Sequence, residues 1–134
     1  MKEDFVPERY NTVMPYLILP NAGQFASFVE KVFGGKENEE IRHMRDDKTI
    51  MHSEINIGDV TIMFADSTKE YPPVPASLFI YVKDSDKTFQ TALENGATEI
   101  MKVSDQPYGR SGGVADPFGN KWWITSEKKT DSNN

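Results

Sequence analysis

The residues best suited to chemistry are His52 and Glu54, which stand two positions apart in the stretch MHSEINIG. Side chains two apart on an extended strand share a face, so an imidazole and a carboxylate would lie side by side. The pair could begin a metal site, line the polar side of a pocket or hydrogen-bond each other at its rim, or supply a histidine with a pKa near ~6.5 as an acid or base. A metal site needs three or four converging donors, and no spacing around His43, the other histidine, supplies them. We therefore predict a pocket rim and retain acid-base catalysis by His52.

A second group stands near the other end of the chain, where Tyr108 and Arg110 precede Gly112 and Gly113. A phenol and a guanidinium there could meet an anionic or planar ligand, or could cover the end of a sheet. The stretch GRSGG lacks the lysine and the following helix of a phosphate-binding loop, so that function is excluded. Its glycines instead favour close strand approach, which leaves room for a pocket.

Composition limits the function classes further. The chain has 134 residues, no cysteine and a formal net charge of −6, so disulfides, thiolate metal sites and nonspecific nucleic-acid binding are excluded. No apolar run approaches the ~20 residues of a membrane helix, and the N-terminus lacks the apolar run of a signal peptide. We expect one cytoplasmic domain with neither nucleic acid nor membrane as a partner.

The elements that must position these residues occur in two similar series. In each, a short strand is followed by an amphipathic helix that ends at glycine, and then by three extended pieces. In the first series the strand VMPYLILP precedes a helix capped by Asn21 and stopped by Gly34 and Gly35, and the extended pieces are 37–45, 50–57 and 60–65. In the second, SLFIYV precedes a helix from about Asp84 to Asn95 and Gly96. A shift of 61 residues superposes the two series, which indicates an internal repeat.

The boundaries follow from this repeat. We predict a loose N-terminal arm at 1–11, module one at about 12–66, a proline-rich linker at 67–75, module two at about 76–126, and a disordered tail at 127–134. Each βαβββ module leaves one sheet face bare, so we expect helices on the outer faces and a shared inner concavity. Strand alternation directs Met63, Ser77, Phe79 and Tyr81 toward this concavity, and Val60, Ile62, Phe64, Leu78, Ile80 and Val82 toward the helices.

Three stretches, PYLILPNA, MHSEINIGDVTIMFAD and YGRSGGVADPFGNKWWIT, resemble the vicinal oxygen chelate superfamily of glyoxalases, bleomycin-resistance proteins and dioxygenases, and within it the PhnB-like branch. The resemblance covers about residues 12–126. It implies an α+β fold in which duplicated βαβββ modules form a curved mixed sheet around a cavity. It also implies that Trp122 packs against a helix while Trp123 faces the cavity, with two core indoles as the alternative, and that the protein is a homodimer.

Metal-dependent members of the superfamily place ligands in the first and last strand of each half. Carried over to this chain, those places fall on Pro15, Met63, Ser77 and Trp123, none of which is an ordinary ligand. A shift of one residue in either direction supplies none. We therefore predict no metal and no other cofactor, although a divalent metal stays an alternative that the ligand residues do not support.

The sequence thus predicts a protein of the glyoxalase and bleomycin-resistance type that binds a small organic molecule without the usual metal site and without catalysing a reaction. The predicted pocket consists of Met63, Ser77, Phe79, Tyr81, Tyr108, Arg110 and Trp123. The alternative is a metal-dependent or His-assisted lyase, isomerase or dioxygenase, in which His52 and Glu54 are the catalytic candidates.

Overall fold

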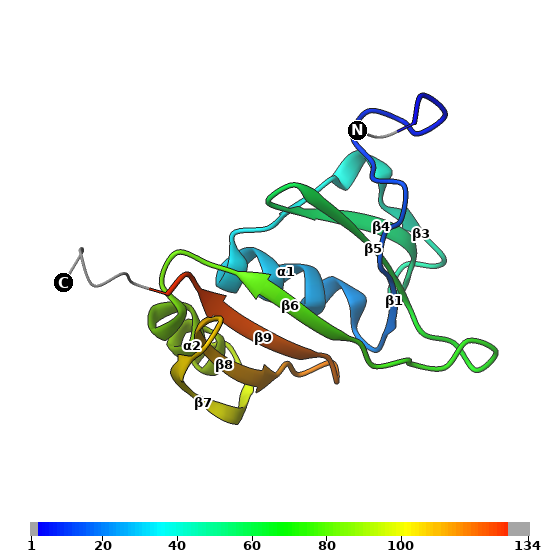
Figure 1. Ribbon diagram of the computed structural model, residues 1–134. Helices are drawn as coiled ribbons and strands as arrows, with labels where there is room; N and C mark the ends of the chain where they lie inside the picture. The colour runs from blue at the N-terminus through cyan, green and yellow to red at the C-terminus, as the bar shows by residue number, and fades with distance from the viewer. Residues whose placement is uncertain (1–2, 129–134) are drawn as a thin grey trace. The chain divides into compact units, whose positions relative to one another are not determined.

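The computed structural model describes residues 3–128, which form two α-helices, one short 3-10 helix and nine strands. They belong to two compact units that adjoin at Pro75 and Ala76. Residues 67–75, between the last strand of the first unit and the first strand of the second, contain no helix or strand (Figure 1). Neither helix is long and apolar enough to span a membrane.

The first unit is a mixed sheet with one helix. Its strands run in the order β1-β5-β4-β2, with β3 paired to β4, and only the β1 and β5 pair is parallel. The elements are β1 (Tyr16–Leu19), α1 (Ala22–Phe33), β2 (Lys36–Glu37), the 3-10 helix η1 (Glu39–Ile41), β3 (His43–Met44), β4 (Ile50–Ile57) and β5 (Val60–Asp66).

The second unit repeats this plan with a four-stranded sheet in the order β6-β9-β8-β7, in which β6 and β9 are parallel. The elements are β6 (Ser77–Tyr81), α2 (Ser85–Glu94), β7 (Thr98–Gln106), β8 (Gly109–Ala115) and β9 (Lys121–Ser126). The predicted α+β class and the duplicated order are therefore confirmed, and neither sheet closes into a barrel. The shared concavity stays a prediction.

The start of α1 differs from the prediction. Asn21 precedes the helix but adopts a left-handed conformation with φ 56°, and its side chain makes no capping hydrogen bond. The acceptor comes instead from the end of β5, where Oδ1 of Asp66 accepts from the N–H of Ala22 at 2.9 Å. The other oxygen of Asp66 accepts from the N–H of Ile50 at 2.6 Å. A carboxylate at a helix N-terminus is favourable because it meets free N–H groups and the positive end of the helix dipole.

The predicted helix ends are confirmed. Gly34 has φ 70° and donates to the carbonyl of Glu30, as expected for a left-handed C-terminal residue that only glycine adopts without strain. In the second unit, Asp84 caps α2 by accepting from the N–H of Lys87 at 3.1 Å, and Gly96 follows the helix with φ 100°.

One face of each sheet packs on its helix. In the first unit, the Phe25 ring of α1 meets Phe64 of β5 edge to face at 5.4 Å, and Ile55 and Ile62 are buried on the same side. In the second unit, a Cβ on Gly112 would approach the Phe89 ring of α2 at 3.1 Å, which places α2 on the Gly112 side of β8. The strand register puts Leu78, Ile80, Trp122, Ile124 and Val114 on that side too. Burial of each large side chain contributes about 1.5–3 kcal/mol.

The segment 37–45 and the two ends of the chain need separate comparison with the prediction. The piece 37–45, predicted as one strand, is divided into β2, η1 and β3 because the chain turns at Glu39–Ile41. The arm at 1–11 is mostly exposed over its described residues, but Tyr10 is half-buried and Arg9 reaches Glu54. Of the predicted tail, residues 129–134 lie outside the described part of the chain.

The turn DPFGN is organised by one buried carboxylate, that of Asp116. Its Oδ1 accepts from the N–H groups of Phe118 and Asn120, both at 2.9 Å. Its Oδ2 accepts from the Asn120 side chain at 2.9 Å and from the Trp122 indole at 2.8 Å. Because Asn120 also accepts from the N–H of Ala76 at 3.1 Å, this turn fixes where β9 begins beside β6.

Candidate functional site

The sheet face opposite α2 carries a group of aromatic residues that we call the aromatic face: Ser77, Phe79, Tyr81, Tyr108 and Trp123. The Phe79 ring lies 5.2 Å from that of Tyr81 and 6.2 Å from that of Tyr108. Phe79, Tyr81 and Tyr108 are 51, 67 and 54% exposed. Rings that contact one another while keeping half of their surface free offer a planar molecule a ready stacking surface.

Trp123 is held in place on this face from two sides. Its indole N–H donates to Oγ of Ser77 at 2.8 Å, across the parallel β6 and β9 pair. Gly113 lies directly opposite on β8, and a Cβ there would fall 2.4 Å from Cζ3 of the indole. The ring therefore covers a position that has no side chain. Five of the predicted pocket residues come together in this arrangement.

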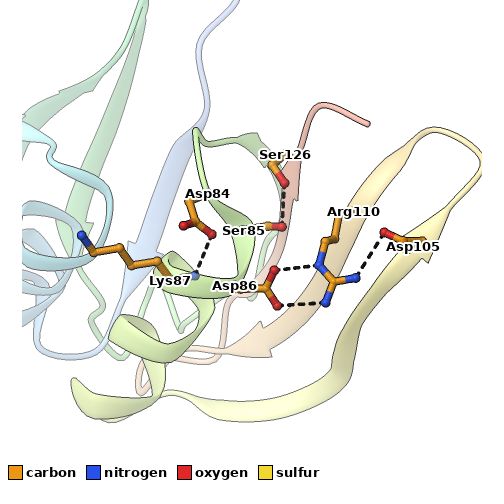
Figure 2. A network of polar contacts seen from close by, with 7 residues as sticks. All are labelled: Asp84, Ser85, Asp86, Lys87, Asp105, Arg110 and Ser126. Atoms are coloured by element: carbon orange, nitrogen blue, oxygen red, sulfur yellow. Dashed lines mark hydrogen bonds and ion pairs between the residues drawn. The ribbon is translucent and has the colours of Figure 1, made fainter. Parts of the chain in front are cut away.

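Arg110 does not join them. It alternates with Ser111 along β8 and shares the α2 side of the sheet with Gly112. Its guanidinium donates two hydrogen bonds to Asp86, at 2.6 and 3.1 Å, and one to Asp105 at 3.2 Å (Figure 2). These carboxylates raise the pKa of Arg110 above its usual value. Two carboxylates already occupy its donors, so Arg110 is not an anchor for a ligand on the aromatic face.

A hollow of about 1130 Å³ lies beside this ion pair at the start of α2. Positively and negatively charged side chains line it, among them Lys83, Lys87 and Asp84. Ser85 and Ser126 share a buried hydrogen bond of 2.7 Å at its edge (Figure 2). Because its charges are of both signs, this hollow carries no clear preference for an anion or a cation.

In the first unit, the face opposite α1 carries polar side chains beside Met63. Glu54 of β4 is only 1% exposed and stands opposite Met63 of β5. Its Oε1 accepts from the Tyr10 hydroxyl at 3.1 Å and from the Asn38 amide at 3.3 Å, and lies 3.6 Å from the Arg9 guanidinium. Its Oε2 is buried and has no hydrogen-bond partner among the described residues. We call Arg9, Tyr10, Asn38 and Glu54 the carboxylate cluster.

His52 occupies the same face through a different partner. Its Nδ1 lies 3.2 Å from the hydroxyl of Tyr16, and the two ring centroids are 5.5 Å apart. His43 of β3 is the cross-strand neighbour of His52. Of the two alternatives for His52 and Glu54, the hydrogen bond between them is not formed, and each has a different partner.

The four places carried over from metal-dependent relatives form two pairs, one in each unit. In the first, the N–H of Met63 donates to the carbonyl of Pro15 at 2.9 Å. In the second, the indole N–H of Trp123 donates a hydrogen bond to the hydroxyl of Ser77. Over residues 3–128, no group of three or more His, Asp or Glu side chains is placed to hold a metal ion. A thioether, a hydroxyl and an indole N–H do not form the oxygen and nitrogen donor set that a catalytic divalent ion requires.

The sequence did not point to Arg9, Tyr10, Asn38 or Tyr16. Arg9 and Tyr10 belong to a terminal segment without periodicity, and Asn38 lies where a continuous strand was predicted. Tyr16 does alternate with the buried Leu17, and this signal could have placed it on the open face beside Met63.

Two repeated βαβββ units, each with a helix on one face of its sheet, define a protein of the glyoxalase type. The family model of the Glyoxalase/Bleomycin resistance protein/Dioxygenase superfamily matches residues 10–124. The chain belongs to this superfamily.

Two mycobacterial proteins are similar in sequence to this chain over most of its length. The chain is 32% identical over 120 residues to the uncharacterized protein Mb0911c of Mycobacterium bovis, covering 81% of this chain and 78% of that protein. It has the same identity to the uncharacterized protein Rv0887c of Mycobacterium tuberculosis, covering 81% of this chain and 69% of that protein.

Solved structures share the fold at lower identity. TioX from Micromonospora sp. ML1 has a TM-score of 0.68 at 20% identity, over 90% of this chain and 98% of that one. The PhnB protein from Bacillus cereus, described as a putative 3-demethylubiquinone-9 3-methyltransferase, has a TM-score of 0.70 at 18% identity, over 87% and 99%. Protein PA1353 from Pseudomonas aeruginosa has a TM-score of 0.72 at 22% identity, over 89% and 99%.

Proposed function

We propose that this protein binds a small planar organic molecule on the aromatic face of its second unit, without a metal ion. The observation that carries the proposal is the contact of three half-exposed rings, Phe79, Tyr81 and Tyr108, beside a tryptophan fixed by Ser77. Fixed rings lose little conformational freedom when a ligand stacks on them, so their contact energy is retained. The polar atoms nearby are hydroxyls and an indole, which suit recognition by stacking more than by charge.

Fluorescence tests this proposal, because Trp123 lies on the aromatic face while Trp122 is buried. The purified protein would be titrated with 2-naphthoate, metal-free bleomycin and S-benzylglutathione, which represent aromatic acids, glycopeptides and thiol conjugates. At least one probe should quench the emission and raise the midpoint of thermal unfolding, since a ligand that binds only the native state stabilises it. If none of the three changes either signal at millimolar concentration, the aromatic face is not a binding site for these classes.

The chain offers a matched pair of tyrosines for the variant test. Tyr81 on the aromatic face and Tyr71 in the segment between β5 and β6 are 67 and 63% exposed. Tyr81→Ala should weaken binding of the active probe by about threefold to tenfold, the equivalent of one aromatic contact. Tyr71→Ala should leave binding unchanged. Equal effects of the two substitutions would contradict the proposal.

A second candidate function is a metal-free enzyme that uses His52 as an acid or base. The observation in its favour is the hydrogen bond between Nδ1 of His52 and Tyr16, which orients the imidazole on the open face of the first unit. His52→Ala should abolish turnover in such an enzyme while leaving probe binding on the aromatic face intact. The homodimer and the cytoplasmic location remain predictions.

A further inference from the structure

The carboxylate cluster of the first unit has an unusual imbalance between its two oxygens. Oε1 of Glu54 faces three donor groups, whereas Oε2 faces none in the described chain. A buried carboxylate usually receives charge-assisted hydrogen bonds, because leaving it without them is costly. Oε2 of Glu54 therefore lacks the donor that its burial calls for.

The nearest cation does not fill this role. The Arg9 guanidinium stays 3.6 Å from Oε1, and its short contact, at 2.8 Å, is with the Tyr10 hydroxyl. The Arg9 side chain is 53% exposed, so water screens much of its charge. Arg9 also stacks over the Tyr10 ring, with 4.8 Å between Cζ and the ring centroid. The cluster thus already holds one guanidinium loosely, between a carboxylate and an aromatic ring.

We propose that the carboxylate cluster binds a small organic cation, of the amidinium or primary ammonium class, whose N–H group donates to Oε2 of Glu54. The phenol ring of Tyr10, whose hydroxyl contacts Glu54, adds the cation-π contact that such ligands favour. Oε2 is closed to solvent, so a ligand enters when a covering group moves. Arg9 and Tyr10 are the contacts of Glu54 that lie on the arm, where Thr61 donates to the carbonyl of Arg9 at 3.2 Å, and they are the groups that would move.

An aliphatic probe separates this site from the aromatic face of the second unit. The full chain would be titrated with cyclohexanecarboxamidine, which is protonated at neutral pH, and with the uncharged cyclohexanecarboxamide of nearly the same shape. The cation should bind at least about tenfold more tightly than the amide, as expected for a charge-assisted hydrogen bond. In amide NMR spectra, the shifts should concentrate on β4, β5 and the arm, and leave β6 and β9 unchanged.

Two variants test the roles of the named groups. Glu54→Gln keeps the shape but removes the charge, and should lower the affinity for the amidinium at least about tenfold. Arg9→Ala removes the competing cation from an exposed position and should raise that affinity. This second variant keeps the test informative if Glu54→Gln does not fold.

Equal binding of cation and amide, no binding of the cation at millimolar concentration, or weaker binding by Arg9→Ala would each overturn the proposal. Shifts confined to the second unit would overturn it too. Because the proposed function rests on Tyr81 and its neighbours in the other unit, either proposal can fail without the other.

Discussion

Replacement of Gly113 by alanine should destabilise the second unit by displacing Trp123. A Cβ at this position would lie 2.4 Å from Cζ3 and 2.7 Å from Cε3 of the indole, closer than carbon atoms approach. The indole cannot rotate away and still donate to Ser77. Overpacking costs about 1–3 kcal/mol and the lost hydrogen bond about 0.5–1.5 kcal/mol, so Gly113→Ala should lower the free energy of unfolding by about 1.5–4.5 kcal/mol.

The effect should reverse once the indole is removed. The three atoms nearest to the added Cβ all belong to Trp123, so in a Trp123→Ala background the methyl group has room. Alanine then stabilises a strand interior by about 0.5–1 kcal/mol relative to glycine. A double-mutant cycle by urea unfolding should give a coupling energy of about 2 kcal/mol or more. If Gly113→Ala costs the same in both backgrounds, the contact between Gly113 and the indole does not explain why glycine stands there.

Three further outcomes are expected. Asp116→Ala should lower the free energy of unfolding by about 3–5 kcal/mol, because it leaves four donors without their buried acceptor, and thermal or urea unfolding measures the loss. The carboxyl of Asp46 accepts from the N–H groups of Lys48 and Thr49, which lowers its pKa. The contribution of Asp46 to stability is therefore present above the pKa of the unfolded state, and it is lost as the pH falls through the lower pKa of the folded state. A carbon-detected NMR titration should find its midpoint below the ordinary value of 3.8, and Asp46→Asn should flatten the fall in stability in that acid range. Arg110→Met should leave probe binding at the aromatic face unchanged, because the guanidinium lies on the other side of the sheet, and a loss of quenching would contradict that placement.

The order of the elements could be predicted from the sequence because its signals are local. Glycine at Gly34 and Gly96 ended both helices, and alternation along SLFIYV sorted Phe79 and Tyr81 from Leu78 and Ile80. These signals depend only on backbone conformation and on which face is apolar. The same alternation placed Phe79 and Tyr81 on one face of β6, and the structure has their rings 5.2 Å apart.

The start of α1 could not be predicted in this way. The cap was assigned to Asn21, its neighbour in sequence, but the acceptor is Asp66, 44 residues away. A tertiary contact of this kind leaves no local signal, since any acidic residue after a strand looks the same in sequence.

The polar residues of the site were harder to place for the same reason. Arg110 was grouped with Tyr108 because they are two residues apart, yet Tyr108 lies in the turn between β7 and β8 and Arg110 lies on the α2 side. Only the strand register and the partners Asp86 and Asp105 determine its face. The contacts of Glu54 with Tyr10 and Asn38 depend on the path of the arm and on the turn at η1, and neither has a periodic pattern.

The double hydrogen bond of Asp66 has a consequence for how the first unit opens. One carboxylate holds the first N–H of α1 and the first N–H of β4, so neither element can fray at that end without loss of the same acceptor. Hydrogen exchange at Ala22 and Ile50 should therefore proceed through a shared opening event, with similar protection at both amides. The helix and the strand, although 28 positions apart at these ends, would behave as one cooperative element.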